Sequence, residues 1–207
     1  MSVSQGEVPQ SPFLWTRGIA ARETVHYLDR NGIDADPLLA SAQLSRSQLS
    51  QDSGGISFAS QQRFLELAAV ETSDSLLGLH LAAGMDLRDA GILFYLAASS
   101  ATVAEVLEHL VRYAGTTSEA LRFEIARQKD ETVLTERPVL ASDEPRRQFS
   151  EFIALAVIRT LRRLTNRDLV PRRITFAHAR HSGLREIHSI VRCPVEFDAK
   201  AGTSRTS

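Results

Sequence analysis

The stretch that decides the fold is GILFYLAASSATVAEVLEHLVRY, from Gly91 to Tyr113. It begins with an apolar run, Ile92 to Ala98, which ends at two serines. Thr102 is then expected to cap a helix. Glu105, three residues later, is expected to reach back to the Thr102 N–H and complete a capping box. The apolar side chains that follow recur every three or four residues, which predicts one buried helix face: Val103, Val106, Leu107, Leu110 and Val111.

The composition is that of an ordinary globular domain. The chain has 207 residues, of which 43% are hydrophobic and 24% charged, with a net charge of -1. Proteins that hold nucleic acid by its phosphates are usually basic, so this balance disfavours DNA binding by these residues.

One cysteine, Cys193, excludes an intrachain disulfide and indicates a reducing compartment. The first residues lack the pattern of a signal peptide. No apolar run reaches the roughly 18–20 residues of a membrane span. We therefore expect a cytoplasmic protein without membrane contact.

The rest of the chain is predicted to form one domain over residues 13–198, between a disordered arm at 1–12 and a disordered tail at 199–207. Helices are expected at about 13–30, after Asp36, and over 60–71, 76–82 and 184–191. A further long helix is expected to start at Ser142 or Asp143 and to carry an apolar stripe from Phe149 to Leu164.

Residues between these helices alternate in the manner of strands. Leu121, Phe123 and Ile125 alternate with polar neighbours, and a second alternating run follows a turn at residues 129–131. This predicts an antiparallel hairpin with one face in the core. Two more strands are expected at 173–178 and 193–197. The fold class is therefore predicted to be α+β, with helices packed on a small antiparallel sheet.

Several short motifs occur in an order that resembles a known family. Besides the stretch at 91–113, these motifs are NGIDADPLL (31–39), LLGLHL (76–81), PRRITFAHA (171–179) and CPVEF (193–197). Together they resemble the arabinose-binding-like N-terminal domain of AraC-type transcriptional regulators, roughly from Gly18 to Phe197. The resemblance implies a sensor that binds a small organic effector between sheet and helices and forms a homodimer. Full-length relatives continue with two helix-turn-helix units that this sequence lacks. DNA contact is therefore expected only through a C-terminal region outside it.

The aromatic residues of the central stretch, the hairpin and the long helix are the candidates for an effector pocket: Phe94, Tyr95, Tyr113, Phe123, Phe149 and Phe152. The alternative for each is simple core packing. Tyr95 and Tyr113 are favoured, because a binding pocket needs a few polar groups in an apolar wall.

The histidines, the cysteine, Glu151 and the arginines are expected to have structural rather than functional roles. His178 and His181 could share a helix face and bind zinc, but His178 falls in a strand pattern, so no metal site and no cofactor are predicted. Cys193 is expected to be a buried apolar residue rather than a nucleophile. Glu151 could receive a cationic effector, but a surface position is favoured. Eight arginines surround the long helix, and a solvated face is favoured over an anion site or a contact with the missing DNA-binding region: Arg146, Arg147, Arg159, Arg162, Arg163, Arg167, Arg172 and Arg173.

No motif of a known enzyme class is present, neither a nucleophile elbow, nor a phosphate-binding glycine loop, nor a zinc-protease signature. The leading hypothesis is a ligand-sensing, dimerising regulatory domain that is not an enzyme. Two alternatives remain: a stand-alone small-molecule-binding protein without a transcriptional role, and an enzyme of unrecognised type.

Overall fold

The structure is a computed structural model that describes residues 14–50, 54–128, 131–139, 145–166, 168–179, 183–197 and 204–206. Its α-helices are α1 Ile19–Arg30, α2 Asp36–Ser41, α3 Phe58–Glu71, α4 Leu77–Gly84, α5 Ile92–Ala98, α6 Val103–Tyr113, α7 Arg147–Thr165 and α8 Leu184–Val191. Single 3₁₀ turns are η1 Arg46–Leu49, η2 Leu87–Ala90 and η3 Ala114–Thr116. The strands are β1 Trp15–Thr16, β2 Ile56–Ser57, β3 Leu121–Gln128, β4 Glu131–Pro138, β5 Ile174–Thr175, β6 Val195–Glu196 and β7 Ser204–Thr206.

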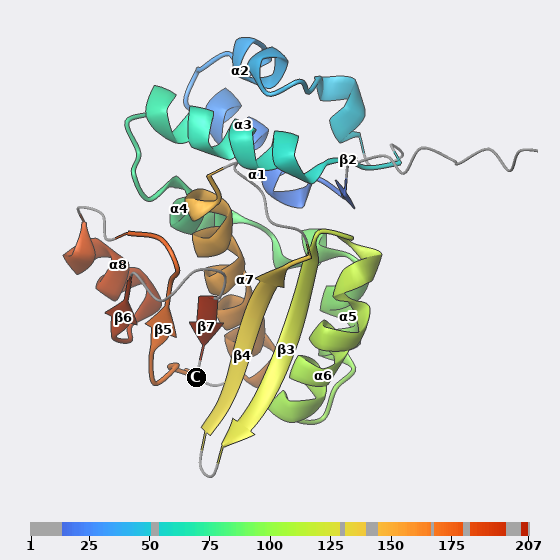
Figure 1. The fold of residues 1–207 in the computed structure, drawn as a ribbon, viewed down its shortest axis with the longest axis vertical. Coiled ribbons are helices and arrows are strands. Elements are labelled where there is room, and N and C mark those ends of the chain that lie inside the picture. The colour runs from blue at the N-terminus through green and yellow to red at the C-terminus, as the bar shows by residue number, and fades with distance from the viewer. Residues whose placement is uncertain are drawn as a thin grey trace, which may run out of the picture.

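The strands form two sheets. β1 and β2 pair antiparallel, and a five-stranded sheet has the order β3-β4-β7-β5-β6. All pairs in the larger sheet are antiparallel except β5 with β6, which is parallel. Figure 1 shows α1, α2 and α3 at one end of the molecule, α5 and α6 beside β3, and α8 next to β5 and β6. The predicted α+β class, with helices on a small antiparallel sheet, is confirmed.

α7 is the helix around which the other elements pack. It passes behind the hairpin and lies against α3, α4, α5 and α6 (Figure 1). Its Phe149, Phe152, Leu155 and Ile158 are buried in a main core shared with α1, α3 and α4. A second, smaller core of Leu107, Ala114, Phe123 and Leu134 lies between α6 and the hairpin. The two cores meet along α7, which therefore joins the helical end of the molecule to the sheet.

Most predicted elements occur where they were expected, but several details were wrong. The first helix begins at Ile19 rather than near residue 13, because Gly18 has a positive φ of 71° and residues 15–16 pair with β2. Glu105 accepts from the Ala101 N–H at 2.7 Å rather than from Thr102, whose own hydroxyl does accept from the Glu105 N–H. Within the expected disordered tail, Ser204–Thr206 form β7.

The long helix begins at Arg147, with Arg146 as its N-cap rather than Ser142 or Asp143. Val111, expected on the buried face of α6, is 38% exposed. The arm at 1–12 and residues 142 and 143 lie outside the described residues.

Candidate functional site

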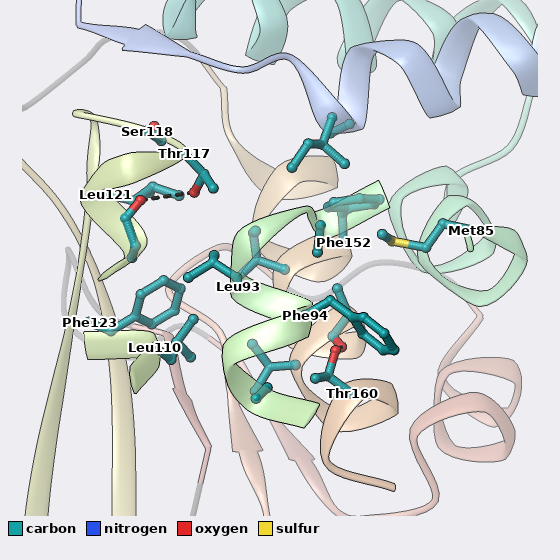
Figure 2. Close-up of a pocket in the computed structure, with 18 of the residues that line it drawn as sticks. Met85, Leu93, Phe94, Leu110, Thr117, Ser118, Leu121, Phe123, Phe152 and Thr160 are labelled. Carbon is teal, nitrogen blue, oxygen red and sulfur yellow. Dashed lines mark hydrogen bonds between the residues drawn. The ribbon is translucent and has the colours of Figure 1, made fainter. Parts of the chain in front are cut away.

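A cavity of about 130 Å³ lies between β3 of the hairpin and the helices α5, α6 and α7. Figure 2 shows Leu93 and Phe94 of α5 pointing into it, with Phe123 and Leu110 at one side and Met85 at the other. Residues from β1 and the start of α1 complete the wall. The cavity therefore collects side chains from segments that lie more than one hundred residues apart in the chain.

Local sequence patterns explain why these elements face the cavity. α6 turns Val106, Leu107 and Leu110 toward it while Glu105 and Glu108 stay exposed. β3 buries Leu121 and Phe123 in its wall, and the alternating Arg122 and Glu124 lie in solvent. α7 contributes most, because its apolar stripe runs along the cavity: Phe149, Phe152, Ile153, Ala156, Val157, Thr160 and Leu161.

The lining carries no charged residue among those the structure describes. Its polar members are four hydroxyl residues and one amide: Thr16, Thr117, Ser118, Thr160 and Gln61. Gln61 is 1% exposed, and its Oε1 accepts from the Ala21 N–H at 3.3 Å. A largely apolar wall with a few polar groups is the usual make-up of a small-molecule site.

Four of the six predicted pocket residues line this cavity: Phe94, Phe123, Phe149 and Phe152. The rings of Phe149 and Phe152 lie with centroids 6.4 Å apart in a stacked orientation. Phe123, Phe149 and Phe152 are also buried members of the cores, so core packing and cavity lining coincide in them. Whether any of the four contacts a ligand stays a prediction.

The two tyrosines, which were favoured, lie elsewhere. Tyr95 is 61% exposed and meets Phe94 only edge to face, at 5.7 Å. Tyr113 is half-buried between His109 and the guanidinium of Arg112. The polar groups at the cavity are instead those of Gln61 and the hydroxyl residues. The sequence could have pointed to Thr160, since it is a polar residue inside the apolar stripe of α7. No sequence pattern pointed to Gln61.

Glu151 is buried, which corrects the expected surface position. Its side chain is 1% exposed because α7 turns it inward, toward the segment that follows β5. Burial raises the pKa of this carboxyl to about 8. Arg147 opposes that shift, while Glu66 and Asp74 add to it. His178 Nε2 lies 3.3 Å from Glu151 Oε1.

A metal site finds no support around this pair. The described part of the chain contains no cluster of three or more His, Cys, Asp or Glu side chains that could hold a metal ion. His181, the other half of the zinc pattern, lies outside the described residues. Cys193 is buried, and burial raises its pKa, which disfavours the thiolate that a nucleophile needs.

None of the described arginines around α7 lines the cavity, and most of them bond to other parts of the fold. Arg159 donates to the carbonyls of Ala82 and Met85, at the end of α4. Arg162 donates to Leu169 and Val191 carbonyls at 2.8 and 2.9 Å. Others form ion pairs, such as Arg146 with Glu136 and Arg172 with Glu131. Arg167 is outside the described residues.

With this geometry in view, comparison with known proteins identifies the family. Residues 32–203 match the family described as the arabinose-binding domain of AraC transcription regulators, at their N-terminus. The chain belongs to this family. All residues lining the cavity of this arabinose-binding domain fall inside the matched range except Thr16, Ile19 and Ala20. No curated protein matches the chain.

A solved structure supports the fold of the arabinose-binding domain. The crystal structure of the transcriptional regulator CdpR from Pseudomonas aeruginosa is similar with a TM-score of 0.57 and 21% sequence identity. The similarity covers 91% of this chain and 54% of that chain, so the present chain spans about half the length of that regulator. In the part of the domain that the structure describes, no helix is both long and apolar enough to cross a membrane.

Proposed function

We propose that this chain is the effector-sensing part of an AraC-type transcriptional regulator, with no enzymatic role, and that it works in the cytoplasm. A small molecule binds in the cavity between β3 and helices α5, α6 and α7. Phe94, Phe123, Phe149 and Phe152 form the apolar contact surface for it. The observation that carries the proposal is the cavity itself, which lies between sheet and helices and is lined by the stripe of α7.

Binding acts by shifting the population of two arrangements of the domain. A ligand changes an equilibrium only if it prefers one arrangement. α5 is the wall best suited to differ between them, because only Ala97 of its seven residues is buried. α7 connects this wall to the rest, since α5 packs on α7 and Arg159 of α7 also donates to the carbonyl of Met85 at the end of α4. A ligand that draws α5 closer therefore acts on the helix that spans both cores.

A cavity-filling variant tests the site. Ala156→Leu adds three carbons on the α7 wall of the cavity and is expected to abolish the thermal stabilisation that an effector gives. A ligand at ten times its dissociation constant raises stability by roughly 1.4 kcal/mol. Ala104→Leu is the control, because Ala104 is an exposed helical residue on α6, outside the cavity. Effectors found by screening that stabilise Ala156→Leu as well as the parent protein would refute this location.

Homodimer formation is proposed through the outer side of α5 and α6. Ile92 and Tyr95 of α5 are 52% and 61% exposed, and Val111 of α6 is 38% exposed. Exposed large apolar groups on two neighbouring helices fit a self-complementary interface around a two-fold axis. Tyr95→Ser with Ile92→Ser is expected to lower the dimer fraction in sedimentation velocity runs. Val70→Ser on α3, 78% exposed and apart from this side, is the matched control.

DNA recognition is assigned to a region beyond this chain in the longer regulator. The net charge of -1 supports that division, because a phosphate-binding surface is usually basic. The chain alone is expected not to retard promoter DNA at physiological salt. Specific retardation of promoter DNA by these 207 residues would contradict the assignment of DNA recognition to another region.

A further inference from the structure

We infer that the cavity takes an uncharged, mainly apolar molecule of about the size of one aromatic ring, bearing a hydroxyl or N–H group that donates one hydrogen bond. The inference rests on the proposed function and names the ligand class of the same site. Three properties of the cavity carry it: its lack of charge, the way its hydroxyls are already bonded, and its size.

Charge is the first property. No lining residue is ionisable in the part of the chain that the structure describes. The arginine nearest in sequence to the lining Thr160, Arg159, is held by the carbonyls of Ala82 and Met85. An ion placed in this cavity would lose its water without gaining a partner, and burial of an unpaired charge is strongly unfavourable. Carboxylates, phosphates, ammonium groups and zwitterionic amino acids are therefore poor ligands for it.

The hydroxyls, which are four of the five polar lining residues, favour a hydrogen-bond donor on the ligand. Each of the four donates its proton to a backbone carbonyl: Thr160 to Ala156 at 2.8 Å, Thr117 to Ala114 at 2.9 Å, and Thr16 to Thr117 and Ser118 to Trp15, both at 3.4 Å. A hydroxyl whose proton is engaged still carries lone pairs that accept. Figure 2 shows Thr160 at one end of the cavity and Thr117 and Ser118 at the other. Ser118 Oγ already accepts from the Ala120 N–H at 3.2 Å, so Thr117 is the better acceptor at its end. Thr160 at one end and Thr117 at the other can therefore each receive a donor from a ligand.

Size limits the ligand to a small molecule. A dry apolar cavity of roughly 150 Å³ accommodates one benzene molecule in proteins, and this cavity measures about 130 Å³. A single ring with one short substituent fills that space. Sugars are disfavoured for a second reason, because their many hydroxyls would meet Phe, Leu, Val and Ile side chains and lose hydrogen bonds on burial.

A set of monosubstituted benzenes tests the class. The four compounds each carry one benzene ring. Benzyl alcohol adds a hydrogen-bond donor and toluene adds no polar group, whereas benzoate adds an anion and benzylammonium adds a cation. Binding is measured at pH 7 by ligand-observed NMR titration on the full chain. Benzyl alcohol is expected to bind at least about tenfold more tightly than either ion, because each ion would be buried without a partner. It is also expected to bind about fivefold more tightly than toluene. An ion that binds as well as the alcohol, or failure of the alcohol to bind, overturns the inference.

Two threonines on α7 supply a matched pair of variants. Thr160 and Thr165 both donate to the carbonyl four residues earlier at 2.8 Å, but only Thr160 lines the cavity. Thr160→Val, or Thr117→Val at the other end, is expected to remove the advantage of benzyl alcohol over toluene. Thr165→Val is expected to keep it. Loss of the advantage in Thr165→Val, or its survival in both cavity variants, contradicts the donor assignment.

The outcomes separate this inference from the proposed function. If benzoate or benzylammonium binds and Ala156→Leu abolishes that binding, the cavity is the effector site and the ligand class is wrong. If no ligand from any screen is affected by Ala156→Leu, the proposed site itself fails.

Discussion

Gly78 of α4 lies directly against Gln148 of α7. The Gly78 N–H donates to Gln148 Oε1 at 2.7 Å, and a Cβ added at Gly78 would come within 2.0 Å of the Gln148 carbonyl oxygen. Gln148 is itself fully buried and also donates to the Ser75 carbonyl. The contact brings two helices together at backbone distance, so a side chain at position 78 has no space.

Gly78→Ala is therefore expected to lower the free energy of unfolding by about 3 kcal/mol or more, since overpacking against backbone cannot relax by a rotamer change. Urea unfolding followed by circular dichroism measures the change. Gly84→Ala is the control on the same helix, because no atom lies within 4 Å of a Cβ there. It is expected to be neutral or slightly stabilising, as alanine favours a helix over glycine. Equal losses in both variants would contradict the tight contact.

Glu151 predicts a pH dependence of stability. Its pKa is raised by burial from 4.5 to about 8, so the folded chain binds this proton more tightly than the unfolded chain. The contribution is fully present below about pH 4.5 and is lost as the pH rises toward 8, so stability falls over this range. The loss is of the order of a few kcal/mol. Glu66, Asp74, Arg147 and His178 are the charged or titratable groups around it.

Glu151→Gln is expected to flatten that slope, because the amide stays neutral while keeping the shape of the side chain. Urea unfolding at several pH values between 5 and 8.5 measures it. Glu108→Gln, at an exposed position on α6, is expected to leave the slope unchanged. A slope that persists in Glu151→Gln would assign the pH dependence to other groups.

Gly91 sets the start of α5, the wall of the cavity that is least buried. Its φ of 61° and ψ of -133° lie in a region that only glycine adopts without strain. Gly91→Ala is expected to cost about 1–3 kcal/mol of stability and to increase hydrogen exchange within α5. The effect is backbone strain alone, because no atom lies within 4 Å of a Cβ there. Gly115→Ala, equally open and without a positive φ, should change neither quantity.

The cap of α6 gives a smaller and local effect. The Thr102 hydroxyl accepts from the Glu105 N–H at 3.2 Å and satisfies one free N–H of the first turn. Thr102→Ala is expected to lower stability by about 1 kcal/mol. Thr116→Ala is the control, because its hydroxyl only donates to the Tyr113 carbonyl at an exposed position. A loss in the control as large as in Thr102→Ala would show that the cap is not the cause.

Local patterns made part of this fold predictable. The capping residue Thr102 and the spacing of Val106 and Leu107 determine α6, and the alternation of Leu121 and Phe123 determines the hairpin, because each depends on neighbours within a few residues. The start of α1 was missed because β1 pairs with β2 some forty residues later, which no local pattern encodes. β7 was missed for the same reason, since its partners in β4 lie about seventy residues earlier.

The cavity could be predicted only in part. The stripe of α7 places Phe149 and Phe152 on a buried face, and spacing alone reveals that. α5 offers no such guide, because all seven of its residues are apolar or aromatic and no polar side marks the surface. The phenolic hydroxyl therefore decided in favour of Tyr95, yet Phe94 lines the cavity and Tyr95 lies in solvent. Gln61 reaches the cavity through the packing of α3 on α1, which is a tertiary property.

The position of β7 has a consequence for how the domain is made on the ribosome. β7 is the last strand described in the chain, yet it lies between β4 and β5 and joins the hairpin to the β5–β6 pair. Since synthesis runs from the N-terminus, the hairpin can form early, but the five-stranded sheet cannot close until residues 204–206 have left the exit tunnel. Until then the facing edges of β4 and β5 remain open to a chaperone or to a second nascent chain.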